Sequence, residues 1–148
     1  MVIFFGKAET DSEFKERAAK LKKPKRKISL SGLHKKAWDL FSKIVRIEER
    51  GVCYTCGKID HWKNQHAGHF KHKDCMDFIR RNIHCQCPQC NKWKHGKLDA
   101  YAEHLVKDYG PSILEELTIM SNKLKKFSRG ELEDLIEDYK KKLEEVKP

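Results

Sequence analysis

The 148-residue sequence contains no apolar run of the roughly 20 residues that a membrane span requires. Its first 14 residues also lack a secretory signal, because only five apolar residues precede the first charge and no basic segment comes before them. These absences predict a protein without membrane association that stays in the cytoplasm, where thiols are kept reduced. The six cysteines are therefore expected to bind metal rather than to form disulfides.

Acidic residues are scarce relative to basic ones, with 22 Asp and Glu against 32 Lys and Arg, so the formal net charge is +10. Residues 111–148 are nearly balanced, with 8 basic and 9 acidic side chains, whereas residues 1–110 have 24 and 13. Because a basic surface attracts polyanions, we expect a nucleic acid as partner. The alternative is a solubilising arm. The densest basic segment has no acid and contains Lys22, Lys23, Lys25, Arg26 and Lys27.

Few glycines and prolines, 8 and 4, interrupt the chain, and composition divides it into three predicted parts. Residues 1–32 form a basic arm, in which a short helix begins at a Thr10 cap and ends before Pro24. Residues 33–110 form the core and residues 111–148 a helical tail.

Apolar periodicity predicts a helix over residues 33–50, preceded by a linker at 29–32, and another helix over 97–109. Capping-box patterns at 112–115 and 128–131 predict two helices in the tail. We expect the apolar stripe of the last helix to pack on the chain's own core, and the alternative is a homodimer interface. The stripe consists of Leu132, Leu135, Ile136, Tyr139, Leu143 and Val146.

Four of the six cysteines form two C-x-x-C pairs. The pairs are Cys53 with Cys56 and Cys87 with Cys90. Each pair presents two thiolates to one ion, and four thiolates complete a tetrahedral zinc site. Such a site has no open position, so the predicted zinc is structural and joins two distant segments. Cys75 and Cys85 are expected to be ordinary thiols.

Thirty residues separate Cys56 from Cys87, whereas a plain zinc ribbon has about 15–20 at this place. The surplus is long enough for a β-hairpin and carries several histidines. Asn91 and His95 follow the second pair and are four residues apart, so on a helix they would share one face. A second ion bound there would have nitrogen and oxygen ligands and could keep open positions for water and phosphate.

The order of His69, Asn82 and Asn91 around the second cysteine pair resembles the HNH nuclease motif, which has the ββα-metal fold. The resemblance implies an α+β fold, with a small zinc-clipped HNH core and flanking helices. More narrowly, residues 34–146 resemble the NinG or Rap family of phage recombination nucleases. The segments that carry this similarity are Cys53-Tyr-Thr-Cys-Gly57, Ala67-Gly-His-Phe70, Asn82-Ile-His-Cys-Gln-Cys-Pro-Gln-Cys-Asn91 and the later Tyr101, Leu105 and Gly110.

The resemblance implies a role for each motif residue. His69 would be the general base that takes a proton from water, and Asn82 would orient it or hold its loop. Asn91 would bind the catalytic divalent ion, Mg²⁺ or Mn²⁺, and His95 is a candidate for a further ligand. In a phage-encoded protein the location would be the host-cell cytoplasm.

Gly68 departs from the HNH pattern, because many HNH nucleases have an acidic or histidine ligand just before the base. The nearest substitute is His66, which on a regular strand points away from His69. A bulge at Gly68 would bring the two imidazoles together. A site with several imidazoles would favour a transition metal other than Mg²⁺.

These observations predict a metal-dependent DNA endonuclease that acts on branched or recombination-intermediate DNA. The expectation of a branched substrate rests only on the family resemblance. Arg80 and Arg81 are expected to contact phosphate. The alternatives are a zinc-finger DNA-binding module without catalysis and a structural factor that binds protein. A protein-binding role does not require the basic excess of residues 1–110.

Overall fold

The computed structural model describes residues 10–20 and 27–147. Four of the predicted DNA-binding residues, Lys22, Lys23, Lys25 and Arg26, lie outside the described residues. Lys27 is exposed. The arm helix α1, Asp11–Lys20, follows Thr10 as predicted and has no buried residue. No helix within the described ranges is both long and apolar enough to cross a membrane.

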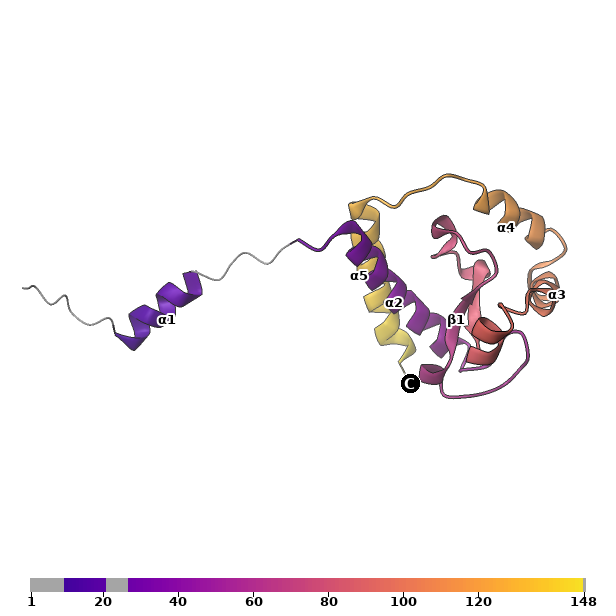
Figure 1. Cartoon of the computed structure of the whole chain (residues 1–148), viewed down its shortest axis with the longest axis horizontal. Helices are drawn as coiled ribbons and strands as arrows, with labels where there is room; N and C mark the ends of the chain where they lie inside the picture. Colours follow the sequence, from indigo (N-terminus) through magenta and orange to yellow (C-terminus); the bar gives the residue numbers. More distant parts are fainter. Residues whose placement is uncertain (1–9, 21–26, 148) are drawn as a thin grey trace, which may run out of the picture.

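The central element is helix α2, Leu30–Glu48, which packs on two neighbours at once. Its first half contacts helix α5, Arg129–Val146, and its second half covers a two-stranded antiparallel sheet of β1, His66–His69, and β2, Ile83–Gln86. Figure 1 shows α5 lying alongside α2. The fold is thus a helix-rich α+β arrangement around a small sheet.

The apolar stripe of α5 packs on the chain's own core, as predicted. Leu132 and Ile136 are buried against Leu33 and Ala37 of α2. This contact occupies the helix face that was the alternative homodimer interface, and the oligomeric state stays a prediction.

A second core lies on the other side of the sheet. Helices α3, Leu98–Tyr109, and α4, Ile113–Ser121, pack there against the loop between β1 and β2. The hydroxyl of Tyr101, which is fully buried on α3, donates to the Gly68 carbonyl oxygen at 2.9 Å. The sheet is therefore held from both faces, which fixes the position of the candidate site.

Two helix starts differ from the predictions. Helix α2 begins at Leu30, because the Ser29 side chain accepts from the Gly32 N–H and caps it, so residues 29–32 are not a linker. Ser112 does not form a capping box, because its backbone is already helical and its hydroxyl donates to the Glu116 carboxylate. The capping box at Ser128 is present.

Candidate metal centre and active site

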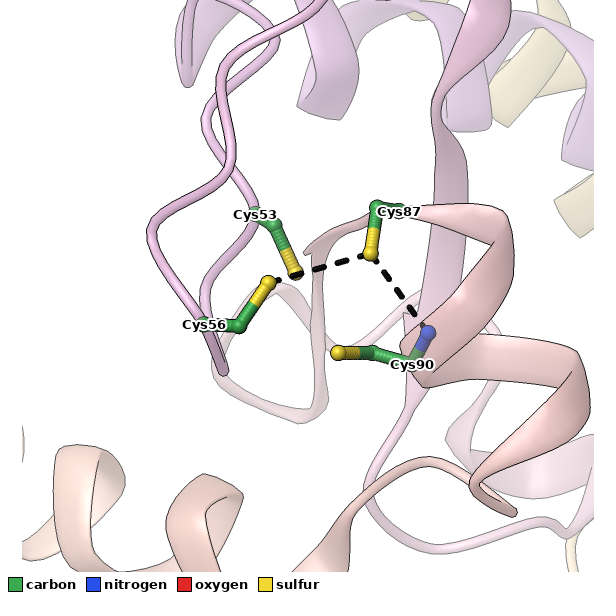
Figure 2. A group of neighbouring side chains, drawn as sticks. All are labelled: Cys53, Cys56, Cys87 and Cys90. Carbon is green, nitrogen blue, oxygen red and sulfur yellow. Dashed lines mark hydrogen bonds between the residues drawn. The ribbon is translucent and has the colours of Figure 1, made fainter.

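The four cysteines of the C-x-x-C pairs form one group. Cys53 and Cys56 lie in the loop after α2, and Cys87 and Cys90 follow β2. Their sulfur atoms all lie within 4.8 Å of one another, and Figure 2 shows the two pairs facing each other. The Cys56 and Cys87 sulfurs are 3.8 Å apart, which matches the edge of about 3.8 Å for a tetrahedron with metal–sulfur bonds of about 2.3 Å. The group can hold a structural metal ion such as zinc.

Local hydrogen bonds prepare one of these thiols for ionisation. Burial opposes the charged form of Cys53, but hydrogen bonds from the Thr55 side chain and from backbone N–H groups lower its pKa to about 6. Burial raises the pKa of Cys56 to about 12, so its deprotonation at neutral pH depends on a bound cation. Cys85, fully buried on β2 outside the group, also has its pKa raised to about 12 by burial.

The sheet brings His66 and Asn91 together. His66 Nδ1 lies 3.1 Å from the side-chain nitrogen of Asn91, in the π-helical turn Gln89–Trp93 after the last cysteine pair. The pairing of β1 with β2 is regular from His66 to His69, so Gly68 does not form the bulge that would have brought the two imidazoles together. His66 reaches Asn91 without it, and His66 and His69 lie on opposite faces of β1.

Gln86 is a candidate ligand that the sequence analysis missed. It pairs with His66 across the sheet, and its side-chain nitrogen donates to the Gly96 carbonyl at 2.8 Å. This bond turns the amide oxygen toward Gly68, where it is buried without a hydrogen-bond partner in the described structure. A Cβ atom added at Gly68 would lie 2.0 Å from this oxygen and 3.1 Å from the Asn91 oxygen.

This face of the sheet gathers three side chains with nitrogen and oxygen donor atoms. The three side chains are His66, with one imidazole, and Asn91 and Gln86, with one amide oxygen each. They surround Gly68, the position at which many HNH nucleases have an acidic or histidine ligand. Burial, with smaller effects of Lys92 and Arg46, lowers the pKa of His66, so the ring is neutral and able to bind metal at neutral pH. Alternation along β2 is the sequence signal for Gln86, since it places residues 84 and 86 on one face.

His69 is held by a carboxylate that no sequence pattern indicated. Its Nε2 atom lies 3.0 Å from Asp77 Oδ1, and the other oxygen of Asp77 is 3.3 Å from His34 Nε2. The His69 ring stacks on Trp38 of α2, with 4.7 Å between ring centroids. His69 and Asp77 are both about four-fifths buried, with side-chain exposures of 17% and 18%. The imidazole is thus fixed in position by contacts from α2 and from the inter-strand loop.

Trp38 links the two halves of the candidate site. Besides stacking on His69, it lines a hollow of about 250 Å³ together with His66 and Asn91. Arg46, whose guanidinium bonds to the carbonyls of Trp62 and Gln65, lies on the same hollow. The candidate base and the candidate ligands therefore flank one aromatic side chain.

Asn82 holds the loop that follows β1. Its side-chain oxygen accepts from the Lys71 N–H at 2.8 Å, and its nitrogen donates to the Lys71 and Met76 carbonyls. The residue is fully buried, and none of these bonds involves His69. Of the two roles that the resemblance implied, the contacts favour loop support, and they keep Asp77 within reach of His69.

We expect Asn82→Ala to lower the free energy of unfolding by about 3 kcal/mol, because it removes three hydrogen bonds of a fully buried side chain. Urea denaturation measures this change. Asn64→Ala is the matched control, since Asn64 is exposed and bonds only to Asp60; its effect should stay within about 1 kcal/mol. Equal effects of the two substitutions would contradict the loop-support role.

Three other predicted residues have different surroundings from those expected. The helical turn with Asn91 ends at Trp93, so His95 lies exposed in the following turn and does not share a helix face with Asn91. Arg80 bonds to Glu48, Glu49 and the Ile83 carbonyl. Arg81 bonds to Glu116 at 2.8 Å. Both arginines are therefore paired with acidic side chains of the chain itself.

Comparison with known proteins identifies the family of the chain. The family model described as Bacteriophage Lambda NinG protein matches residues 6–148. The chain belongs to the NinG family. Proteins named Protein ninG from Salmonella phage P22 and Escherichia phage lambda are each 29% identical to it over 119 residues, which is 76% of this chain.

The chain spans a little over half the length of these NinG relatives, 57% of the Salmonella phage P22 protein and 56% of the lambda protein. The NinG protein of Escherichia phage 933W is similar to the same degree, with 29% identity over 119 residues. No solved structure matches the chain.

Proposed function

We propose that this NinG chain is a metal-dependent DNA endonuclease with an HNH-type ββα-metal core. The observation that carries the proposal is the placement of His69. It is held by Asp77 at the end of β1 and shares Trp38 with the donor set of His66, Asn91 and Gln86. The nearby group of four cysteines supplies a rigid support when it binds zinc.

The proposed chemistry assigns a task to each group. With its Nε2–H donated to Asp77, His69 keeps Nδ1 free to accept a proton from the attacking water. His66, Asn91 and Gln86 would hold a divalent ion, Mg²⁺ or Mn²⁺, which supplies charge neutralisation at the phosphate and stabilisation of the leaving oxygen. The basic excess of residues 1–110 favours DNA as the polyanion that is bound.

Branched recombination intermediates are the proposed substrates, because of the similarity to the NinG and Rap nucleases. The test is cleavage of a labelled four-way junction beside matched linear duplex and single strand, each with Mg²⁺, Mn²⁺ or no added ion. We expect ion-dependent cutting with the junction preferred. Equal cutting of all three DNAs would contradict the branched-DNA preference. Tight binding without cutting would favour the alternative, a zinc-finger-type DNA-binding module.

The basic arm is expected to add affinity that does not depend on DNA sequence. Deleting residues 1–27 removes nine basic side chains, five of them clustered in residues 22–27, and each phosphate contact contributes about 0.9 to the slope of log affinity against log salt. With the five clustered side chains on phosphates, the slope should fall by about 4 to 5. Fluorescence anisotropy at several salt concentrations measures it. The Ser29 cap and the core remain in this variant, so its unfolding should not change, and an unaltered slope would exclude the arm from DNA binding.

A further inference from the structure

A basic groove lies beside the candidate active site, between the loop after β1 and the connection from α4 to α5. Two neighbouring hollows form it, of about 400 Å³ and 630 Å³, and both are lined by Asp74, Lys125 and Lys126. Lys73 lines it from one side and Lys123 from the other. We call these five residues the lysine groove. Figure 1 shows that the α4–α5 connection follows the periphery of the molecule.

The charge of the lysine groove is unbalanced. It contains four lysines and one aspartate, so its formal charge is +3. Lys125 pairs with Glu131 at 3.4 Å, but Lys73, Lys123 and Lys126 form no ion pair within the described structure. All four lysines are exposed. Unpaired ammonium groups that line one groove repel one another and attract a polyanion.

The groove lies next to the proposed active site. His34 lines the smaller hollow and lies 3.3 Å from Asp77, which in turn holds His69. A strand whose phosphate is attacked beside His69 would pass close to His34 to reach the groove. Leu124 lies between Lys123 and Lys125 and is fully exposed. DNA-binding proteins use such exposed apolar side chains to contact bases beside their phosphate contacts.

We propose that the lysine groove binds the phosphodiester backbone of a DNA segment adjacent to the cleavage point, with Leu124 against its bases or sugars. The proposal rests on the proposed function, because it takes DNA as the substrate. It adds a contact surface for DNA that is separate from the basic arm of residues 1–32.

The test is DNA binding of a triple variant, Lys73→Gln, Lys123→Gln and Lys126→Gln, to a four-way junction and to linear duplex. Ca²⁺ replaces Mg²⁺ so that the DNA is not cut. The control removes three other exposed lysines on α3 and α5, Lys107→Gln, Lys140→Gln and Lys141→Gln. We expect the groove variant to lose about 10- to 100-fold in affinity at ~0.1 M salt and its salt slope to fall by about 2 to 3. The control should bind nearly as the wild type does.

A second variant tests the groove without a change in charge. Leu124→Ser should weaken binding while leaving the salt slope unaltered, because it removes an apolar contact and no phosphate contact. If the groove variant bound as the control does, the proposal would be overturned, and an acidic protein partner would become the better explanation of the groove. Loss of binding in the groove variant, with a wild type that binds DNA but never cuts it, would support the groove and refute the nuclease.

Discussion

Replacing Cys56 with alanine is expected to release the bound zinc and unfold the core at 25 °C. Structural zinc contributes an apparent 10–16 kcal/mol or so in small domains, which is as large as the whole stability of a typical domain. Cys56 is the informative position because it is exposed, so its removal costs little packing and reports the loss of metal. Cys53→Ala and Cys90→Ala should have the same effect with an added cost of burial. Metal content per chain and thermal unfolding by circular dichroism measure both consequences.

Cys75→Ala is the matched control for the zinc prediction. Cys75 is half-buried and lies outside the group of four. Its sulfur hydrogen-bonds to the backbone carbonyls of residues 120 and 121, and its side chain packs at the edge of the second core. This variant should retain one zinc ion per chain and stay folded. A Cys56→Ala protein that kept its metal and its melting temperature would show that the four thiols do not form a structural zinc site.

His69→Ala is expected to lower the single-turnover rate of DNA cleavage by about 10²- to 10⁴-fold, the usual contribution of a positioned general base. The cost in stability should be about 1–3 kcal/mol, because the substitution removes the stack on Trp38 and the hydrogen bond to Asp77. Rate and stability are therefore measured on the same preparation. His61→Ala is the matched control, since His61 is an exposed histidine in the preceding turn.

Two results would remove His69 from the role of base. One is a cleavage rate within a fewfold of the His61→Ala rate. The other is global unfolding of His69→Ala, since the account assigns the main support of the fold to the zinc group and to the packing of α2. Asp77→Asn separates a loss of catalysis from a loss of folding. It keeps the size of the side chain but replaces the carboxylate that holds His69 Nε2 with an amide.

The sequence predicted correctly those features for which a local pattern of residues is compatible with only one arrangement. Two C-x-x-C pairs predict a four-thiolate group across any intervening length, and the four sulfurs do lie together. The stripe of α5 predicted packing on the core, and Leu132 and Ile136 are buried there. The expected loop-holding role of Asn82 is likewise consistent with its three hydrogen bonds.

The parts that could not be predicted depend on contacts between distant segments. Asp77 and His34 meet His69 only because α2 packs over the sheet and the inter-strand loop folds back toward it. Gln86 was missed because its amide oxygen faces Gly68 only in the folded chain, where the amide nitrogen is held by Gly96 and Thr55. The pairing of Asn91 with His95 failed because a π-helical turn ends at Trp93 in place of a longer α-helix.

A metal titration tests whether this NinG chain hydrolyses DNA with a divalent ion. Zinc-loaded wild-type protein is incubated with an end-labelled four-way junction while Mg²⁺ or Mn²⁺ is raised from zero. We expect no cutting without added ion, saturable cutting with at least one of the two ions, and loss of that cutting in Asn91→Ala. Tight binding of the junction with no cutting at any ion concentration would refute the nuclease.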